Sequence, residues 1–341
     1  MPGQVTLSDV AREAGVSLAT ASRALNGSAT RTVGEELRVR VVAAAARLHY
    51  SPDGIAQAMA RGRTTSLGLV VPDIADPRFA AIASGVVAAA TAAGLTVALT
   101  VSGADPEVEA AHIHRLEHQR AQGVVLVGGT MTDAAAEAPV RAALASFRSV
   151  GGGVAVIGRP DLGADVVDAG ESSAAADFAR ALHGLGYRKV ALLVGPGVGG
   201  ARATALAEEF AVLGSPVPAA LRLAGKATVG GGYAAVREMI ASGADVDLVV
   251  AVNDVLALGA LAGAGESGVA VPAELAVAGF DGLEAGDEAV PVLTTVRVPY
   301  VRIGEEAVGL ALSAVGRAGA TDRPRTVHVP TEVLLRESTA R

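Results

Sequence analysis

Residues 6–27, TLSDVAREAGVSLATASRALNG, contain the start and stop signals of two short helices. Thr6 and Asp9 have the three-residue spacing of a capping box, which satisfies free amide groups at a helix start. Gly15 can end this helix, because glycine adopts the left-handed conformation common at helix C-termini. Apolar residues recur on one face between these signals: Val10, Ala11 and Ala14. The first half of the segment therefore predicts a capped helix that buries one face.

The second half predicts another helix, with Ser17 as its N-cap and Asn26-Gly27 as its stop. Its inward positions are Ala21 and Leu25, and two helices joined by so short a glycine-bearing turn are typical of a helix-turn-helix unit. The outward positions carry side chains that can reach phosphates and base edges in a major groove. They are Ser17, Leu18, Ala19, Thr20, Ser22, Arg23 and Asn26. We expect this face to read DNA.

The segment after this unit predicts two further helices. Thr32 and Glu35 have the spacing of a second capping box, and the helix that follows completes a three-helix core. Its inner face carries Leu37, Val41, Ala45 and Leu48. Ser51 and Pro52 signal the start of a short helix that ends before Gly62. That helix has little apolar surface, so we expect it to order only on a partner.

The composition excludes several classes of protein. The 341 residues include no cysteine, so neither a disulfide framework nor a thiolate metal site is expected. No apolar run reaches about 18 residues without a charge, Gly or Pro, so no membrane span is expected. The start, MPGQVTLSDV, lacks the basic and apolar regions of an export signal. A multidomain cytoplasmic protein is the expectation.

Charge is distributed unevenly along the chain. Residues 1–63 contain eight Arg and five Asp or Glu, a net charge of +3, whereas the remainder contains 20 basic and 30 acidic residues, a net charge of −10. A basic segment on an acidic body suits a polyanion bound at one end. A small helical domain with an unselected charge balance explains the numbers equally well, so the helix-turn-helix signals carry the DNA-binding prediction.

From residue 66 the chain alternates apolar runs with Ala-rich segments of helical length. The runs are SLGLVV, TVALTV, GVVLVG and GVAVIG, followed by KVALLV, LVVAV and LAVAGF. Runs this apolar between helices indicate buried parallel strands, and they form two series joined near residues 159–165. The predicted fold is an all-α headpiece followed by a two-lobed α/β core. Ligands of such sheets bind outside the carboxyl ends of the strands.

The sequence resembles the LacI/GalR family of bacterial transcriptional regulators. The resemblance rests on the first segment, YSP before the short helix, GLVVPDIADPRF, LVVAVNDVLALGAL, VAVAGFDG and LTTVRVP. It implies a homodimer that reads a pseudo-palindromic operator, a hinge helix in the minor groove, and a core of the type I periplasmic-binding-protein fold. It also adds Thr6, Leu7, Tyr50 and Met59 to the expected DNA contacts. Met59 stands where the family usually has a leucine wedge, and methionine is a comparably long apolar side chain.

The implied domains are a headpiece over 1–50, a hinge helix and linker over 51–65, and two lobes. The first lobe is 66–163 with 291–323, and the second is 164–290 with 324–341. Polar and aromatic residues that follow the predicted strands are the effector-site candidates: Asp76, Arg78, Phe79, Arg159, Arg202, Asn253, Asp254 and Asp281. Carboxylates accept hydrogen bonds from adjacent hydroxyl groups and arginine donates in a fixed fork. The alternative is that these residues cap helices or hold the lobes together.

Two positions depart from sugar-responsive members of the family. Thr204 stands where many of them have an arginine that grips the effector, and Ala227 stands where they have an aromatic wall. We therefore expect a larger or decorated saccharide or a small anionic metabolite as effector, in preference to a plain hexose. The C-terminal LLRESTAR shows no heptad pattern, so a dimer is favoured over a tetramer.

Two other motifs are given less weight. GPGVGG, residues 195–200, has the spacing of a dinucleotide loop but lacks the acid about 20 residues later that would hold a ribose. An anionic group bound at that helix start stays open. His114, Glu117 and His118 have the H-x-x-E-H spacing of some zinc peptidases, but a solvated helix face explains them better.

The predicted function is a sequence-specific DNA-binding regulator, most simply a repressor, whose operator affinity is controlled by a small molecule between two lobes. The chain has no Cys, no G-x-S-x-G and no Walker loop, so neither catalysis nor a cofactor is expected. The alternative is a solute-binding or nucleotide-binding protein without a role in transcription. A transport-type binding protein would need a signal peptide and no headpiece, so the first 63 residues favour the regulator.

Overall fold

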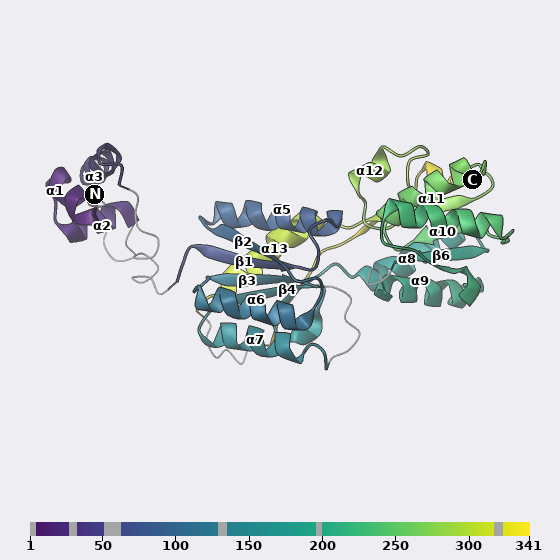
Figure 1. Ribbon diagram of the computed structural model, residues 1–341, viewed down its shortest axis with the longest axis horizontal. Coiled ribbons are helices and arrows are strands. Elements are labelled where there is room, and N and C mark those ends of the chain that lie inside the picture. Colours follow the sequence, from purple (N-terminus) through teal and green to yellow (C-terminus); the bar gives the residue numbers. More distant parts are fainter. Residues whose placement is uncertain (1–4, 27–32, 51–62, 129–134, 196–199, 317–322) are drawn as a thin grey trace. The chain divides into compact units, whose positions relative to one another are not determined.

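A computed structural model describes residues 5–26, 33–50, 63–128, 135–195, 200–316 and 323–341 (Figure 1). The chain divides into two compact units, Met1–Thr65 and Ser66–Arg341. Among the described residues, none of the helices has the length and apolar character needed to cross a membrane. The predicted helix that starts at Ser51 lies outside the described residues, as does its Met59.

The first unit contains three helices, α1 (Leu7–Ala14), α2 (Leu18–Asn26) and α3 (Glu35–Arg47). The predicted capping box of α1 is confirmed, because the Asp9 carboxylate accepts from the Thr6 amide at 3.0 Å and from its hydroxyl at 2.7 Å. Gly15 ends α1 with φ at 65°, in the left-handed region that favours glycine. The predicted N-cap of α2 is also confirmed, since Ser17 Oγ accepts from the Thr20 amide at 3.1 Å.

The headpiece core is made of small apolar side chains from all three helices. Its buried members are Val10, Ala11, Ala14, Ala21, Val41, Ala44 and Ala45. Ala11 and Ala21 lie where α1 and α2 pack, and such small residues allow a close crossing. The predicted capping box at the start of α3 is wrong: Gly34 is the N-cap, and Glu35 is the first helical residue instead of the third. Glu35 instead pairs with Arg38 at 2.8 Å.

The second unit begins with a six-stranded parallel sheet, in the order β11-β5-β4-β3-β1-β2 (Figure 1). Its strands are β1 (Ser66–Val71), β2 (Thr96–Val101), β3 (Gly123–Val127), β4 (Gly153–Ile157), β5 (Asp165–Asp168) and β11 (Thr326–His328). Helices α5 (Pro77–Ala92) and α13 (Tyr300–Ala314) pack together on one face. Helices α6 (Pro106–His118) and α7 (Ala138–Ser149) pack together on the other.

A second parallel sheet follows in the order β7-β6-β8-β9. Its strands are β6 (Val190–Val194), β7 (Arg222–Ala224), β8 (Leu248–Ala251) and β9 (Ala276–Ala278). Helices α8 (Glu171–Gly184) and α9 (Gly200–Val212) pack together, as do α10 (Val229–Ala241) and α11 (Asp254–Glu266) (Figure 1). The two predicted series of parallel strands are thus confirmed.

The remaining elements are short. Strand β10 (Thr295–Arg297) pairs antiparallel with β12 (Glu332–Leu334), and α12 (Glu284–Asp287) follows β9. Short 3₁₀ helices occupy Pro160–Leu162, Ala219–Leu221 and Glu337–Thr339.

Strand pairing differs from the expected lobe boundaries at two places. β5 and β11, which those boundaries put in the second lobe, pair with each other, and β5 also pairs with β4 in the first sheet. Both strands are only three or four residues long and partly exposed, so their sequence contains no apolar run that assigns them to either sheet.

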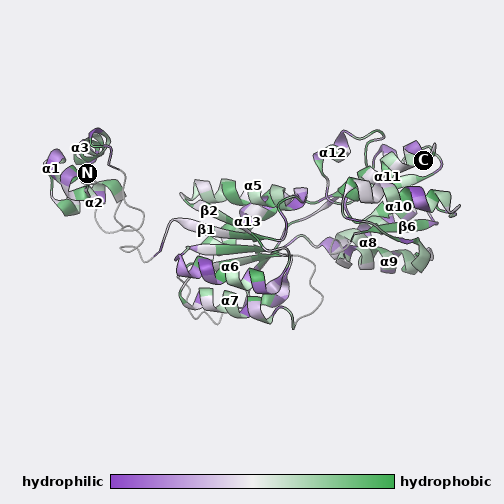
Figure 2. Cartoon of the chain, viewed as in Figure 1, coloured by the Kyte–Doolittle hydropathy of each residue, from purple (hydrophilic) through white to green (hydrophobic). Residues whose placement is uncertain are grey.

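The burial pattern follows from the parallel arrangement. β3, β4 and β8 are buried at every position, as expected for parallel strands covered by helices on both faces. Figure 2 shows the strands mostly in hydrophobic colours and the hydrophilic residues mainly on the helices. Helices α5 and α13 approach closely because Gly85 and Gly304 lack side chains where a Cβ would overlap main-chain atoms of the facing helix.

Candidate functional site

The outer face of α2 carries the side chains predicted to read DNA. Ser17, Leu18 and Ala19 are exposed, with Leu18 at 51%, and Thr20, Ser22 and Arg23 are half-buried. The Ser17 and Thr20 hydroxyls are 2.8 Å apart, and Arg23 Nε donates to the carbonyl oxygen of Ala19 at 2.9 Å. These local bonds orient the polar side chains along one face of a short, capped helix.

The other predicted DNA contacts have different surroundings. Thr6 is exposed at the start of α1, whereas Leu7 and Tyr50 are half-buried and pack against the headpiece core. A DNA contact by Leu7 or Tyr50 stays a prediction, since their described contacts are structural. The side chain of Asn26 and all of Met59 lie outside the described residues.

At the start of α5, Asp76 and Arg78 form a paired unit. Asp76 caps the helix, because its Oδ1 accepts from the Arg78 amide at 2.9 Å. The same carboxylate accepts from Arg78 Nε at 3.1 Å and from Nη2 at 2.6 Å. The guanidinium lies 5.0 Å from the centre of the Phe79 ring, which is buried in the core. Arg78 is therefore held in place on both sides.

Asp281, just after β9, is the point where side chains from both sheets meet. Its Oδ1 accepts from Arg202 Nη1 of α9 at 2.7 Å and from the Tyr300 hydroxyl of α13 at 2.5 Å. Its Oδ2 lies 4.0 Å from Arg78 Nε and is buried without a hydrogen-bond donor. Asp281 also has φ at 128°, a conformation that side-chain-bearing residues rarely adopt. An unpaired buried oxygen on a strained residue is typical of functional sites.

Arg202 is completely buried among acceptors. Its Nε and Nη2 bind both oxygens of Glu171 at 2.9 and 2.8 Å, and Nη1 also donates to the carbonyl oxygen of Val252 at 3.0 Å. Nη2 donates to the Tyr300 hydroxyl at 3.0 Å, and the guanidinium lies 4.3 Å from the centre of the Phe280 ring. We call the connected group the Asp281 cluster; it consists of Asp76, Arg78, Glu171, Arg202, Asp281 and Tyr300.

Asn253 and Asp254 lie at the start of α11 beside this cluster. Asn253 is the N-cap, since its Oδ1 accepts from the Leu256 amide at 2.8 Å. Asp254 is fully buried and accepts from Thr295 Oγ1 at 2.6 Å and from the Leu283 amide at 2.8 Å. Both residues therefore have structural partners, and the alternative interpretation of Asn253 as a helix cap is confirmed.

Burial dominates the titration of the acids here. Burial, and then the neighbouring charge of Asp281, raise the pKa of Asp254 to about 7. The pKa of Asp281 is also raised by burial, although Arg202 and Arg78 oppose the shift. Burial alone would lower the pKa of Arg78, but Asp281 and Asp76 raise it above its ordinary value. Arg78 is thus charged at every physiological pH.

Arg159, the remaining effector candidate, has its described ionic contacts in a different group. Its Nη1 binds Glu109 of α6 at 2.7 Å, and its Nε binds Glu137 at the start of α7 at 3.0 Å. These contacts join β4 to two helices of the first sheet, and burial raises the pKa of Glu109 despite Arg159. A role of Arg159 in effector binding stays a prediction.

Sequence reasoning missed Glu171, Thr295 and Tyr300. Glu171 begins α8 and Tyr300 begins α13, so both stand at helix starts that follow predicted strands or crossings. Tyr300 directly follows the LTTVRVP segment, which was itself a usable signal. The two departures noted above also have defined places: Thr204 is exposed on α9, and Ala227 lies against Gly195.

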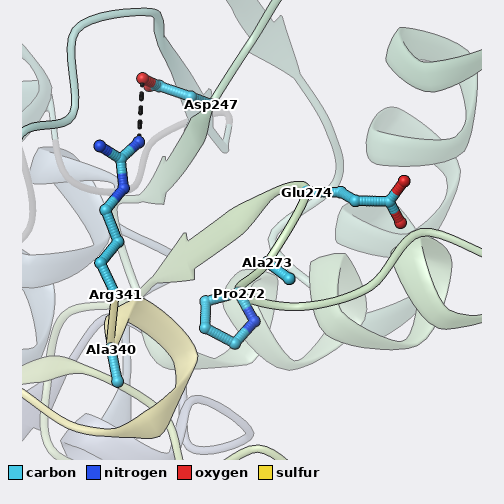
Figure 3. A pocket seen from close by; sticks show the side chains of 6 residues that line it. All are labelled: Asp247, Pro272, Ala273, Glu274, Ala340 and Arg341. Atoms are coloured by element: carbon cyan, nitrogen blue, oxygen red, sulfur yellow. Dashed lines mark hydrogen bonds and ion pairs between the residues drawn. The ribbon is translucent and has the colours of Figure 1, made fainter.

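A cavity of about 510 Å³ lies elsewhere, at the amino-terminal ends of β8 and β9 (Figure 3). It is lined by Asp247, Pro272, Ala273, Glu274, Ala340 and Arg341. Arg341 pairs with Asp247 at 3.3 Å, so its charge is already balanced. The Asp281 cluster is at the opposite, carboxyl-terminal ends of the strands, where ligands of parallel sheets bind.

The two motifs given less weight gain no support. His114 Nδ1 lies 3.4 Å from Glu117, but the described residues contain no group of three or more acids and histidines that could hold a metal. In the glycine-rich GPGVGG segment, residues 196–199 lie outside the described part of the chain.

Known proteins resemble this chain along nearly its whole length. Residues 6–53 match the bacterial regulatory proteins, lacI family, and residues 179–339 match the periplasmic binding protein-like domain. The chain is 31% identical over 336 residues to the HTH-type transcriptional regulator GalR of Salmonella typhimurium, which covers 97% of this chain and 94% of the relative.

Two solved structures extend the likeness to three dimensions. The lac repressor dimer bound to operator and the anti-inducer ONPF has a TM-score of 0.85, with 24% identity and coverage of 99% of this chain and 100% of that one. A complex of the transcriptional regulator CelR with cellobiose has a TM-score of 0.68, with 28% identity and coverage of 98% and 99%. The first of these likenesses shows the fold.

Proposed function

Because this chain belongs to the lacI family of bacterial regulatory proteins, we propose that it is a transcriptional repressor whose affinity for operator DNA is controlled by a small molecule bound at the Asp281 cluster. It consists of a helix-turn-helix headpiece and an α/β effector-binding core. It works as a homodimer on a pseudo-palindromic operator, as the resemblance to the lac repressor dimer supports. The cytoplasm, where bacterial DNA is transcribed, is its place of action.

The exposed face of α2 is the observation that carries the DNA-binding half of the proposal. Leu18 and Ala19 occupy its first turn, where apolar side chains contact a thymine methyl group. Arg23 and the Ser17 and Thr20 hydroxyls supply donors for phosphates and base edges. Arg40 supports this face from below, since its Nη2 donates to the Ala14 carbonyl oxygen at 2.6 Å and so joins α3 to the end of α1.

The unpaired Oδ2 of Asp281 supports the effector half. A buried acceptor without a donor costs about 1–3 kcal/mol, and more when it is charged, so the oxygen gains most from a ligand that donates to it. CelR binds cellobiose, a hydroxyl-rich ligand, and a relative of this kind supports a sugar or sugar-like effector here. Asp254 and Thr295 lie next to the same segment and fix its position.

The same contacts give the effector a way to reach the DNA. Arg78 and Tyr300 belong to α5 and α13 of the first sheet, and Arg202 and Asp281 belong to elements of the second. We take these two sheets with their helices as the two lobes of the core. A ligand that binds among these four side chains changes how the lobes contact each other, and a coupling of about 1–3 kcal/mol is typical of such transitions.

Fluorescence anisotropy on the full chain tests the proposal. Labelled DNA containing an operator obtained by in vitro selection is titrated at several salt concentrations. We expect log affinity to fall linearly with log salt, and Arg23→Ala to weaken binding about tenfold or more. Arg302→Ala is the matched control, because Arg302 is an exposed arginine of α13 paired with Glu306 at 3.7 Å. Equal affinities for Arg23→Ala and the control contradict the role of α2.

A further inference from the structure

The arginines of the Asp281 cluster are already committed to the chain's own acceptors. A guanidinium has five N–H donors, and Arg202 uses all five, on Glu171, Asp281, Tyr300 and a carbonyl oxygen. A ligand carboxylate or phosphate can therefore bind Arg202 only by breaking one of these buried bonds. Arg202 is not available as an anion-binding residue while this network is intact.

Arg78 is committed in a similar way. Its Nε and Nη2 bind both oxygens of Asp76, and its position is fixed further by the Phe79 ring. Its side chain is 13% exposed, so its remaining Nη1 donors can meet a ligand hydroxyl. The positive charge of Arg78, however, is balanced by Asp76 and faces Asp281 at 4.0 Å.

The charge of the cluster as a whole is negative. It contains three carboxylates, Asp76, Glu171 and Asp281, and two guanidinium groups, so its formal net charge is −1. Its one orphan atom is also an acceptor, Asp281 Oδ2. A buried site with excess negative charge and an unfilled acceptor attracts hydrogen-bond donors and repels anions.

From this arrangement, and resting on the proposed function, we infer that the effector is a small polyhydroxylated compound without negative charge. One of its hydroxyl or ammonium groups donates to Asp281 Oδ2, and its ring hydroxyls accept from Arg78 Nη1. Phosphate esters and sugar acids are excluded by the charge of the cluster. Of the alternatives that the sequence left open, the saccharide is thus favoured over the anionic metabolite.

Matched ligand sets test the inference on the full chain. Hexoses and disaccharides, their 2-amino derivatives, their phosphate esters and their uronic acids are screened by thermal shift at pH 7 and constant ionic strength, and hits are measured by calorimetry. We expect binders among the neutral and amino members, with the anionic counterpart of each binder at least tenfold weaker. An anionic member that binds as tightly as its neutral counterpart overturns the inference, as does a screen in which no neutral or amino member binds.

Two variants separate charge from shape. Arg78→Gln removes one positive charge from the cluster and should shift the ratio of amino-sugar to neutral-sugar affinity severalfold toward the amino sugar. Arg302→Gln, the exposed control on α13, should leave that ratio unchanged. An unchanged ratio in Arg78→Gln refutes selection by charge. DNA binding by the full chain is measured in parallel, so that a failure of the ligand class is distinguished from a failure of the proposed regulator.

Discussion

Replacing Asp254 by asparagine should change how the stability of the core depends on pH. Asp254 is fully buried, and its pKa is raised from 3.8 to about 7 by burial and then by Asp281. Between pH 4 and 7 the unfolded chain has lost this proton, whereas the folded chain keeps it. The folded state therefore binds more protons, and the free energy of unfolding contributed by Asp254 falls as the pH rises through this window.

The size of the effect follows from the shift. One pKa unit corresponds to about 1.4 kcal/mol, so a shift of about three units gives on the order of 4 kcal/mol between pH 4 and 8. Asparagine is uncharged and close in shape to the protonated acid, and its amide and carbonyl can bond to Thr295 and to the Leu283 amide. Asp254→Asn should match the wild type near pH 4 and exceed its stability increasingly up to about pH 8.

Urea unfolding followed by circular dichroism at a series of pH values measures this difference. Asp245→Asn is the control, because Asp245 is 79% exposed and pairs with Lys189 on the surface. The control should track the wild type at every pH, within about 0.5 kcal/mol. A stability difference between Asp254→Asn and the wild type that is constant from pH 4 to 8 would refute the reasoning.

Further variants test the packing and the DNA-binding surface. Gly85→Ala should lower the melting temperature, because the added methyl overlaps a main-chain carbonyl of α13, whereas Gly309→Ala has open space and should raise stability by up to about 1 kcal/mol. If both alanines have the same effect in thermal melts, the close helix approach is wrong. Deletion of residues 1–63 should abolish DNA binding in gel-shift titrations, and retained affinity contradicts a role of the headpiece. Leu18→Gln should change base preference by about 1–3 kcal/mol per affected base pair in a selection experiment, and recovery of the same operator would make Leu18 structural.

Local signals accounted for much of the fold. The caps at Thr6, Gly15 and Ser17 depend on side chains within three residues of each other, so their chemistry is visible in the sequence. The long apolar strands were equally clear. The start of α3 was wrong, since Gly34 replaces Thr32 as the cap, and β11 was missed because three half-exposed residues have no period.

The candidate site was predictable only in part. Asp76, Arg78 and Asp281 follow predicted strands, and parallel topology brings such positions to one edge. Which residues pair there depends on contacts across long sequence separations, such as Tyr300 with Arg202. No local pattern shows that Arg202 is saturated or that Arg159 pairs with acids of its own sheet, because these facts depend on three-dimensional packing.

The most direct test of the regulator is the effect of a bound ligand on its DNA affinity. Full-length protein is titrated on its selected operator by anisotropy, with and without a ligand that stabilises the protein in the thermal-shift screen. A coupling of about 1–3 kcal/mol predicts that the ligand changes operator affinity about 5- to 150-fold. The change should disappear in Asp281→Asn, which removes the charge of the central acceptor while nonspecific DNA binding persists. An operator affinity that is the same with and without saturating ligand contradicts effector control by this site.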